Sequence, residues 1–99
     1  MIIVHASMNA KPGQRDKLIE ALRPCVDATR KEDGCISYSL FAKTEDEIGL
    51  MFVEQWESKD ALRKHLATDH FKRMKEDRMP YAADGDNPIV LFEAKQESL

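Results

Sequence analysis

Apolar side chains occupy both faces of several predicted strands, and this pattern restricts the fold more than any other feature of the sequence. Residues 2–8 read Ile-Ile-Val-His-Ala-Ser-Met, residues 50–53 read Leu-Met-Phe-Val, and residues 89–92 read Ile-Val-Leu-Phe. Successive side chains of a strand point to opposite faces, so a sheet with one face in water carries apolar residues on one face only. Both faces of the predicted sheet must therefore be covered.

Two helical segments separate these strands. Leu18, Leu22 and Val26 recur at spacings of four between residues 14 and 32, which is typical of a helix with one buried face. Pro24 removes a backbone donor from this helix and is expected to kink it. The remaining expected elements are strands at residues 35–43, 48–56 and 89–95, and a loop at residues 84–88.

The second helical segment begins after Ser58, a suitable N-cap, bends at residues 68–69 and stops at Pro80. Gly34, directly after the first helix, suits the left-handed conformation that often follows a helix end. The order is then strand-helix-strand-strand-helix-strand within one domain of 99 residues. We expect an α+β, ferredoxin-like βαββαβ fold with a four-stranded antiparallel sheet.

Two helices can cover only one face of such a sheet. A second copy of the chain, packed sheet against sheet, is the simplest cover for the other face. The doubly apolar strands therefore predict a homodimer.

The composition argues against several classes of function. A net charge of −3 does not supply the basic face that nucleic-acid binding needs. No apolar run approaches the roughly 18 residues that span a bilayer, and the first residues lack the basic region and cleavage site of a signal peptide. Without a secretory signal, Cys25 and Cys35 are expected to be reduced thiols in a cytoplasmic protein.

The most informative group of residues lies between positions 32 and 71. Its members are Glu32, Gly34, Cys35, Tyr38, Phe52, Glu54, Trp56, Ser58, Ala61 and His65. This set resembles the antibiotic biosynthesis monooxygenase (ABM) domain family, and within it the small bacterial quinol monooxygenases. The resemblance implies a dimeric α+β barrel with a pocket between sheet and helices. It also implies oxygenation of quinol-like substrates without metal or flavin, although the family includes haem-degrading enzymes and enzymes that process a signalling molecule.

His65 is the first candidate catalytic residue. Leu62 and Leu66 define the inward direction of its helix, and His65 lies on the flank of that face, toward the sheet or its border. An imidazole with a pKa near 6.5 could take a proton from a phenolic hydroxyl at neutral pH. The alternative is a core histidine held by one hydrogen bond.

Glu54 is the second candidate, because it occupies a mid-strand position where its neighbours are apolar. A covered carboxylate needs a partner, and His65, His5 or a backbone donor would serve. The resulting ion pair could be structural, or it could support His65 in catalysis.

The candidate substrate-binding residues are aromatic or polar. Trp56 could stack on an aromatic substrate or could simply anchor the core. His5, Ser7 and Asn9 form a polar stripe on one face of the first strand, which could line the pocket or lie in the dimer interface. His70 is expected to be exposed. The full set is Trp56, Tyr38, Phe71, His5, Ser7 and Asn9.

No cofactor or metal is expected. His65 and His70 are five residues apart, which does not place both on one helical face. The sequence also lacks a glycine-rich phosphate loop and a G-x-S-x-G motif. By the resemblance, the iron-binding histidine of haem-degrading relatives would fall near Lys75, and lysine is a poor haem ligand at neutral pH.

The leading hypothesis is a cofactor-independent monooxygenase that acts on a small quinol or electron-rich phenol. His65 would be the base and Glu54 its support, while Trp56, Tyr38 and Phe71 would hold the ring. Two other hypotheses remain open. One is an isomerase or other proton-transfer enzyme acting on a small hydroxy-carbonyl metabolite, and the other is a non-catalytic ligand-binding dimer.

Overall fold

The structure is a computed structural model that describes residues 1–85 and 87–99. Seven elements follow one another along the chain: β1 (Ile2–Asn9), α1 (Arg15–Thr29), β2 (Cys35–Ala42), β3 (Gly49–Trp56), α2 (Lys59–Leu66), α3 (Asp69–Asp77) and β4 (Ile89–Glu93). The predicted loop at residues 84–88 includes residue 86, which lies outside the described residues.

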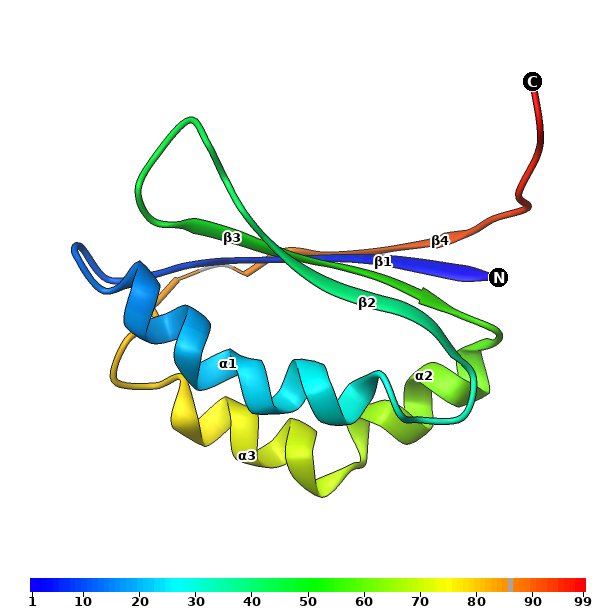
Figure 1. Ribbon diagram of the computed structural model, residues 1–99, viewed down its shortest axis with the longest axis horizontal. Helices are drawn as coiled ribbons and strands as arrows, with labels where there is room; N and C mark the ends of the chain where they lie inside the picture. The colour runs from blue at the N-terminus through cyan, green and yellow to red at the C-terminus, as the bar shows by residue number, and fades with distance from the viewer. Residues whose placement is uncertain (86) are drawn as a thin grey trace.

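The four strands form one antiparallel sheet in the order β2-β3-β1-β4. β1 runs along β3 with Val4 opposite Glu54 and Ala6 opposite Phe52. All three helices lie on one side of this sheet (Figure 1). The element order and the sheet confirm the predicted α+β, ferredoxin-like βαββαβ fold with a four-stranded antiparallel sheet.

The core lies between the sheet and the helices. Ile2 and Val4 on β1 belong to the same buried cluster as Leu18 and Leu22 on α1. α1 continues through Pro24 to its last residue at position 29. The apolar residues of α1 that recur at spacings of four, Leu18, Leu22 and Val26, are all buried in this core, as their spacing predicts.

The predicted bend at residues 68–69 is a break between two separate helices. Ser58 caps α2, because its Oγ accepts the backbone N–H of Ala61 at 3.1 Å. Thr68 caps α3 in the same way and accepts the N–H of Phe71 at 3.3 Å. Two short helices therefore replace the single bent one, and each starts at its own side-chain cap. No helix among the described residues is long and apolar enough to cross a membrane.

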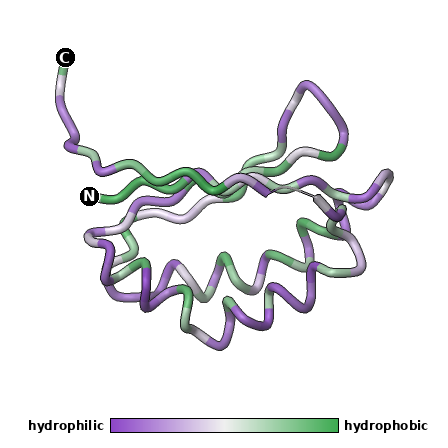
Figure 2. Tube along the Cα trace, turned by 180° about the vertical axis from the view of Figure 1, so that it is seen from behind, coloured by the Kyte–Doolittle hydropathy of each residue, from purple (hydrophilic) through white to green (hydrophobic). Residues whose placement is uncertain are grey.

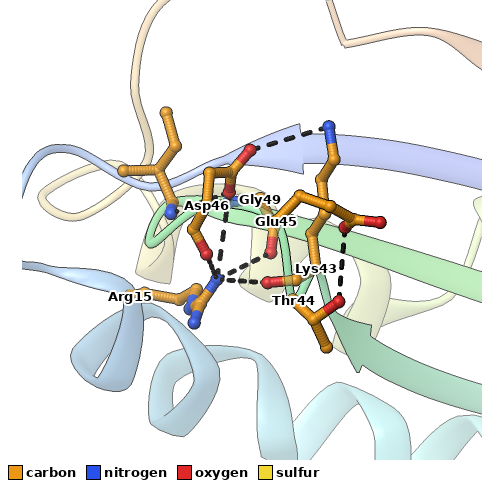
Figure 3. A network of polar contacts seen from close by, with 7 residues as sticks. Arg15, Lys43, Thr44, Glu45, Asp46 and Gly49 are labelled. Atoms are coloured by element: carbon orange, nitrogen blue, oxygen red, sulfur yellow. Dashed lines mark hydrogen bonds and ion pairs between the residues drawn. The ribbon is translucent and has the colours of Figure 1, made fainter.

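Arg15 ties the start of α1 to the connection between β2 and β3 (Figure 3). Its Nη1 donates to the backbone carbonyls of Lys43 and Asp46, both at 3.0 Å, and to that of Gly49 at 3.4 Å. The carboxylate of Asp46 accepts the N–H groups of Ile48 and Gly49. These bonds fix the far end of the sheet against the helical layer.

In the part of the chain that the structure describes, no helix covers the other face of the sheet (Figure 1). Hydrophobic residues are nevertheless concentrated along the strands (Figure 2). Phe41 on β2 is 56% exposed, and Val90 and Phe92 on β4 are each 46% exposed. The register places these side chains on the bare face, opposite the helices. The homodimer stays a prediction, and this face is the surface that it would cover.

Candidate active site

A cavity of about 200 Å³ lies between the sheet and the pair of helices α2 and α3. Its walls come from all four strands and both helices and are mostly apolar. An apolar protein cavity of about 150 Å³ can hold a benzene ring, so this space suits a small aromatic molecule. Tyr38, Glu54 and His65 add polar groups to the apolar wall.

His65 lies in the last turn of α2, lines the cavity and is only 1% exposed. The aromatic rings of Trp56 and Phe71 pack against its imidazole, with ring centroids 4.8 and 5.0 Å away. Its Nδ1 lies 2.7 Å from Oε2 of Glu32. Burial lowers the pKa of His65, and the hydrogen bond with Glu32 opposes this shift.

The bond to Glu32 decides which ring nitrogen of His65 carries the proton. A carboxylate can only accept, so Nδ1 of His65 donates and Nε2 of the neutral ring holds the free lone pair. His65 lines the cavity whereas Glu32 does not. The basic nitrogen therefore belongs to the part of the ring that faces the cavity.

Glu32 is a partner of His65 that the sequence did not predict. It lies in the turn after α1, where its N–H donates to the carbonyl of Thr29 and its own carbonyl accepts from Cys35. The two side chains are 33 residues apart, and no local spacing rule connects them. Glu32 was nevertheless among the residues that carry the family resemblance, which was the available signal.

The prediction that His70 is exposed is wrong. Its side chain is 27% exposed, and its Nε2 lies 2.8 Å from the same Oε2 of Glu32. The chain breaks at Thr68 before α3 begins, so His70 lies in the first turn of a new helix. The five-residue spacing from His65 therefore spans two helices, and the rule for a single helical face does not apply.

Glu54 also lines the cavity and is 5% exposed. Its Oε1 accepts the indole N–H of Trp56 at 2.9 Å, so Trp56 is its partner, in place of the expected His65 or His5. Residues two apart on a strand share one face, which brings these two side chains together. Burial raises the pKa of Glu54 to about 7, against the opposing effect of the Trp56 bond.

The aromatic candidates divide into two groups. Tyr38 and Phe71 line the cavity, whereas Trp56 is fully buried behind it and supports both Glu54 and His65. Burial raises the pKa of Tyr38 above its usual range, so its hydroxyl remains protonated and can donate a hydrogen bond.

The polar stripe of β1 does not reach the cavity. His5, Ser7 and Asn9 lie opposite Val53, Met51 and Gly49 on the bare face of the sheet. The cavity takes the alternate residues of β1, namely Val4, Ala6 and Met8. The expectation that these three residues bind substrate in this cavity is therefore corrected, because successive side chains of a strand point to opposite faces and theirs point away from the cavity. His5 instead packs edge-on against Phe92, with centroids 5.6 Å apart.

Among the residues that the structure describes, one group has the composition and spacing to hold a metal ion. It consists of Glu32, His65 and His70, whose ligand atoms all lie within 4.8 Å of one another. Lys75 lines the cavity, and its Nζ lies 5.1 Å from the centre of the Phe71 ring.

The comparisons with known proteins agree on one family. The model of the antibiotic biosynthesis monooxygenase (ABM) family matches residues 1–77. A crystal structure described as an antibiotic biosynthesis monooxygenase superposes with a TM-score of 0.86 and 32% identity. That match covers 97% of this chain and 100% of the other.

Two relatives are similar to this chain in sequence. "Probable quinol monooxygenase YgiN" of Escherichia coli (strain K12) is 29% identical over 86 residues, covering 77% of this chain and 83% of that protein. "Uncharacterized protein sll1783" of Synechocystis is 30% identical over 70 residues, or 71% of this chain. The chain spans about half the length of that relative, since the match covers 48% of it. With its fold, its cavity and these matches, the chain belongs to the antibiotic biosynthesis monooxygenase family.

Proposed function

We propose that this chain is a cofactor-independent monooxygenase that oxidises a small quinol or similar electron-rich phenol with dioxygen. Membership of the family supports a monooxygenase-type oxidoreductase. The observation that carries the finer proposal is the bond between His65 and Glu32 at the wall of an apolar cavity. It leaves a basic nitrogen available beside a space that suits an aromatic ring.

The first step is removal of the phenolic proton. Nε2 of His65 takes the proton, and the carboxylate of Glu32 stabilises the imidazolium through Nδ1. The lowered pKa of His65 keeps the free imidazole neutral and ready to accept at neutral pH. This arrangement gives Glu32 the supporting role that the sequence had suggested for Glu54.

The second step is oxygenation of the anion. An electron-rich phenolate can transfer electrons to dioxygen directly, so one oxygen atom enters the ring and the other leaves as water. The substrate supplies all four electrons and becomes a quinone, and neither a flavin nor a metal is needed for the balance. The apolar walls contribute by excluding water and by holding the ring near dioxygen.

Glu54 and the aromatic residues position the substrate. A carboxyl with a pKa about 7 is partly protonated at neutral pH, so Glu54 can donate to or accept from a second substrate oxygen. Tyr38 offers a protonated hydroxyl, and Phe71 offers an aromatic face. Trp56 acts from behind by holding Glu54 in place.

The working unit would be a homodimer. The helices leave one face of the sheet bare, and apolar side chains on it are about half exposed. A patch of this kind usually marks an interface. Sheet-to-sheet pairing of two copies would cover it and give the dimeric α+β barrel that the family implies.

The test is oxygen uptake with a panel of benzoquinols and naphthoquinols kept reduced until mixing. His65→Gln removes the base yet retains an N–H donor toward Glu32, and we expect turnover to fall by roughly 10²- to 10⁴-fold. Lys64→Ala, an exposed change on the same helix, should leave turnover unchanged. A rate in His65→Gln equal to the wild-type rate would rule out the base.

The other hypotheses have their own outcomes in the same assay. Conversion of a hydroxy-carbonyl compound without oxygen consumption would favour an isomerase that uses His65. Absence of turnover with every substrate, together with a melting temperature that ligands raise, would favour a binding protein.

A further inference from the structure

A second cluster of functional groups lies behind His65, on the side of the imidazole away from the cavity. Oε2 of Glu32 lies 2.7 Å from Nδ1 of His65 and 2.8 Å from Nε2 of His70. The cavity walls include His65 but neither Glu32 nor His70. Glu32 and His70 therefore lie outside the space in which a substrate would bind, and His65 is shared between that space and the cluster.

These three residues form a known type of ligand set. Two imidazole nitrogens and one carboxylate oxygen bind Zn²⁺ in catalytic sites, and a similar set binds Fe²⁺. Their ligand atoms lie within 4.8 Å of one another. An ion about 2.0–2.1 Å from each ligand atom requires those atoms to be about 3.3 Å apart. The two hydrogen-bonded pairs would therefore need to separate by about half an ångström. The two histidine nitrogens, which lie within 4.8 Å of each other, would need to approach by up to about 1.5 Å.

Each ligand comes from a different element, and each element is fixed by its own bonds. Glu32 is held in the turn after α1 by backbone bonds to Thr29 and Cys35. α2 and α3 are joined by Thr68, whose hydroxyl donates to the carbonyl of His65 at 2.7 Å while it caps α3. The three ligands are consequently pre-positioned without a metal, which lowers the entropic cost of binding one.

We propose that Glu32, His65 and His70 bind one divalent transition-metal ion per chain, with Zn²⁺ as the representative ion. The ion would take the place of the N–H protons that these histidines direct at Glu32, and each neutral imidazole would then carry its proton on its other ring nitrogen. Its remaining coordination position would open toward solvent beside His70, which is 27% exposed. This site goes beyond the proposed function, and its occupancy can be measured without any substrate.

The ion would not take part in the chemistry of the cavity. It would bind Nδ1 of His65, whereas the cavity-facing nitrogen is Nε2 on the opposite edge of the ring. It would also occupy the oxygen of Glu32 that accepts from His65 in the metal-free protein. The metal-bound form is thus a second state of the protein, separate from the proposed metal-free catalyst.

The experiment titrates Co²⁺ into tag-free, chelator-treated protein and follows visible absorption, then displaces the cobalt with Zn²⁺. Tetrahedral or five-coordinate Co²⁺ absorbs far more strongly than the aqueous ion. We expect one Co²⁺ per chain, and His70→Ala and Glu32→Gln should each weaken binding by at least about tenfold. His5→Asn removes the third histidine, on the bare face of the sheet, and should change nothing.

His70 is partly exposed, so its replacement should leave the fold intact, and circular dichroism checks this. Zn²⁺ should raise the melting temperature of the wild type and of His5→Asn, but not that of His70→Ala. An aqueous-type cobalt spectrum in the wild type, or equal affinity in folded His70→Ala, would overturn the site. Neither result bears on oxygen uptake by the metal-free protein, so the two proposals fail separately.

Discussion

Gly34 and Ala61 lie so close together that residue 34 has no room for a side chain. A Cβ on Gly34 would lie 2.5 Å from Cβ of Ala61, and its φ of +83° favours glycine. The close approach lets the carbonyl of Gly34 accept the N–H of Glu57 at 2.9 Å. The turn that carries Glu32 is thereby joined to the start of the helix that carries His65. Two residues of the family pattern thus have a packing explanation.

Gly34→Ala should therefore destabilise the protein by more than the cost of placing alanine in a left-handed conformation. The left-handed conformation costs about 1–2 kcal/mol for a non-glycine residue, and forced overpacking adds about 1–3 kcal/mol. Gly13→Ala is the matched control, because Gly13 has a φ of +74° with nothing within 4 Å of the added Cβ. Urea unfolding of both variants measures the difference. Equal losses would show that contact with Ala61 is unimportant.

Glu32 should act through His65 and not independently. Glu32→Gln removes the charge that stabilises the imidazolium, and we expect kcat/KM to fall by roughly 10²- to 10⁴-fold, as in other base–carboxylate pairs. Combined with His65→Gln, it should cause little further loss, since residues of one catalytic unit are not additive. Oxygen-uptake kinetics on the two single variants and the double variant measure this. Multiplicative losses would instead assign Glu32 a separate role.

The bare face of the sheet should hold the dimer together. Light scattering on a sizing column should give about twice the chain mass of 11.3 kDa. Val53→Glu places a charge in the middle of this face, beside His5 on the neighbouring strand, and should yield monomer because an unpaired charge would be buried. Met79→Glu makes the same kind of change at a 68% exposed residue after α3 and should remain dimeric. A monomeric wild type would contradict the prediction.

The fold was predictable because its signals are local. Period-two alternation marks the strands, spacings of three and four mark the helices, and Gly34 marks the end of the first helix. The bond between Glu54 and Trp56 was also accessible, since residues two apart on a strand share a face. Which face the helices cover was not accessible, and the assignment of His5 to the site depended on that choice.

The cluster around Glu32 could not be predicted in the same way. Its three side chains come from a turn and two helices, and they meet only because that turn docks onto α2 through Gly34. Such contacts depend on the packing of whole elements, and no periodicity encodes them. The pattern that carries the family resemblance includes both Glu32 and His65, but it did not place them side by side.

Replacing Glu54 should change how stability depends on pH. The pKa of Glu54 is about 7 in the folded chain and 4.5, the ordinary value for a glutamate, in the unfolded chain. Between these values the unfolded chain releases the proton while the folded chain keeps it. The unfolded state then binds fewer protons, so stability falls as pH rises from about 4.5 to about 7, by at most about 3 kcal/mol. Glu54→Gln keeps an acceptor for Trp56 and cannot ionise, so it should lack this loss and become the more stable protein at pH 8. Urea unfolding of both proteins from pH 4 to pH 8 measures the difference, and parallel curves would show that Glu54 titrates normally.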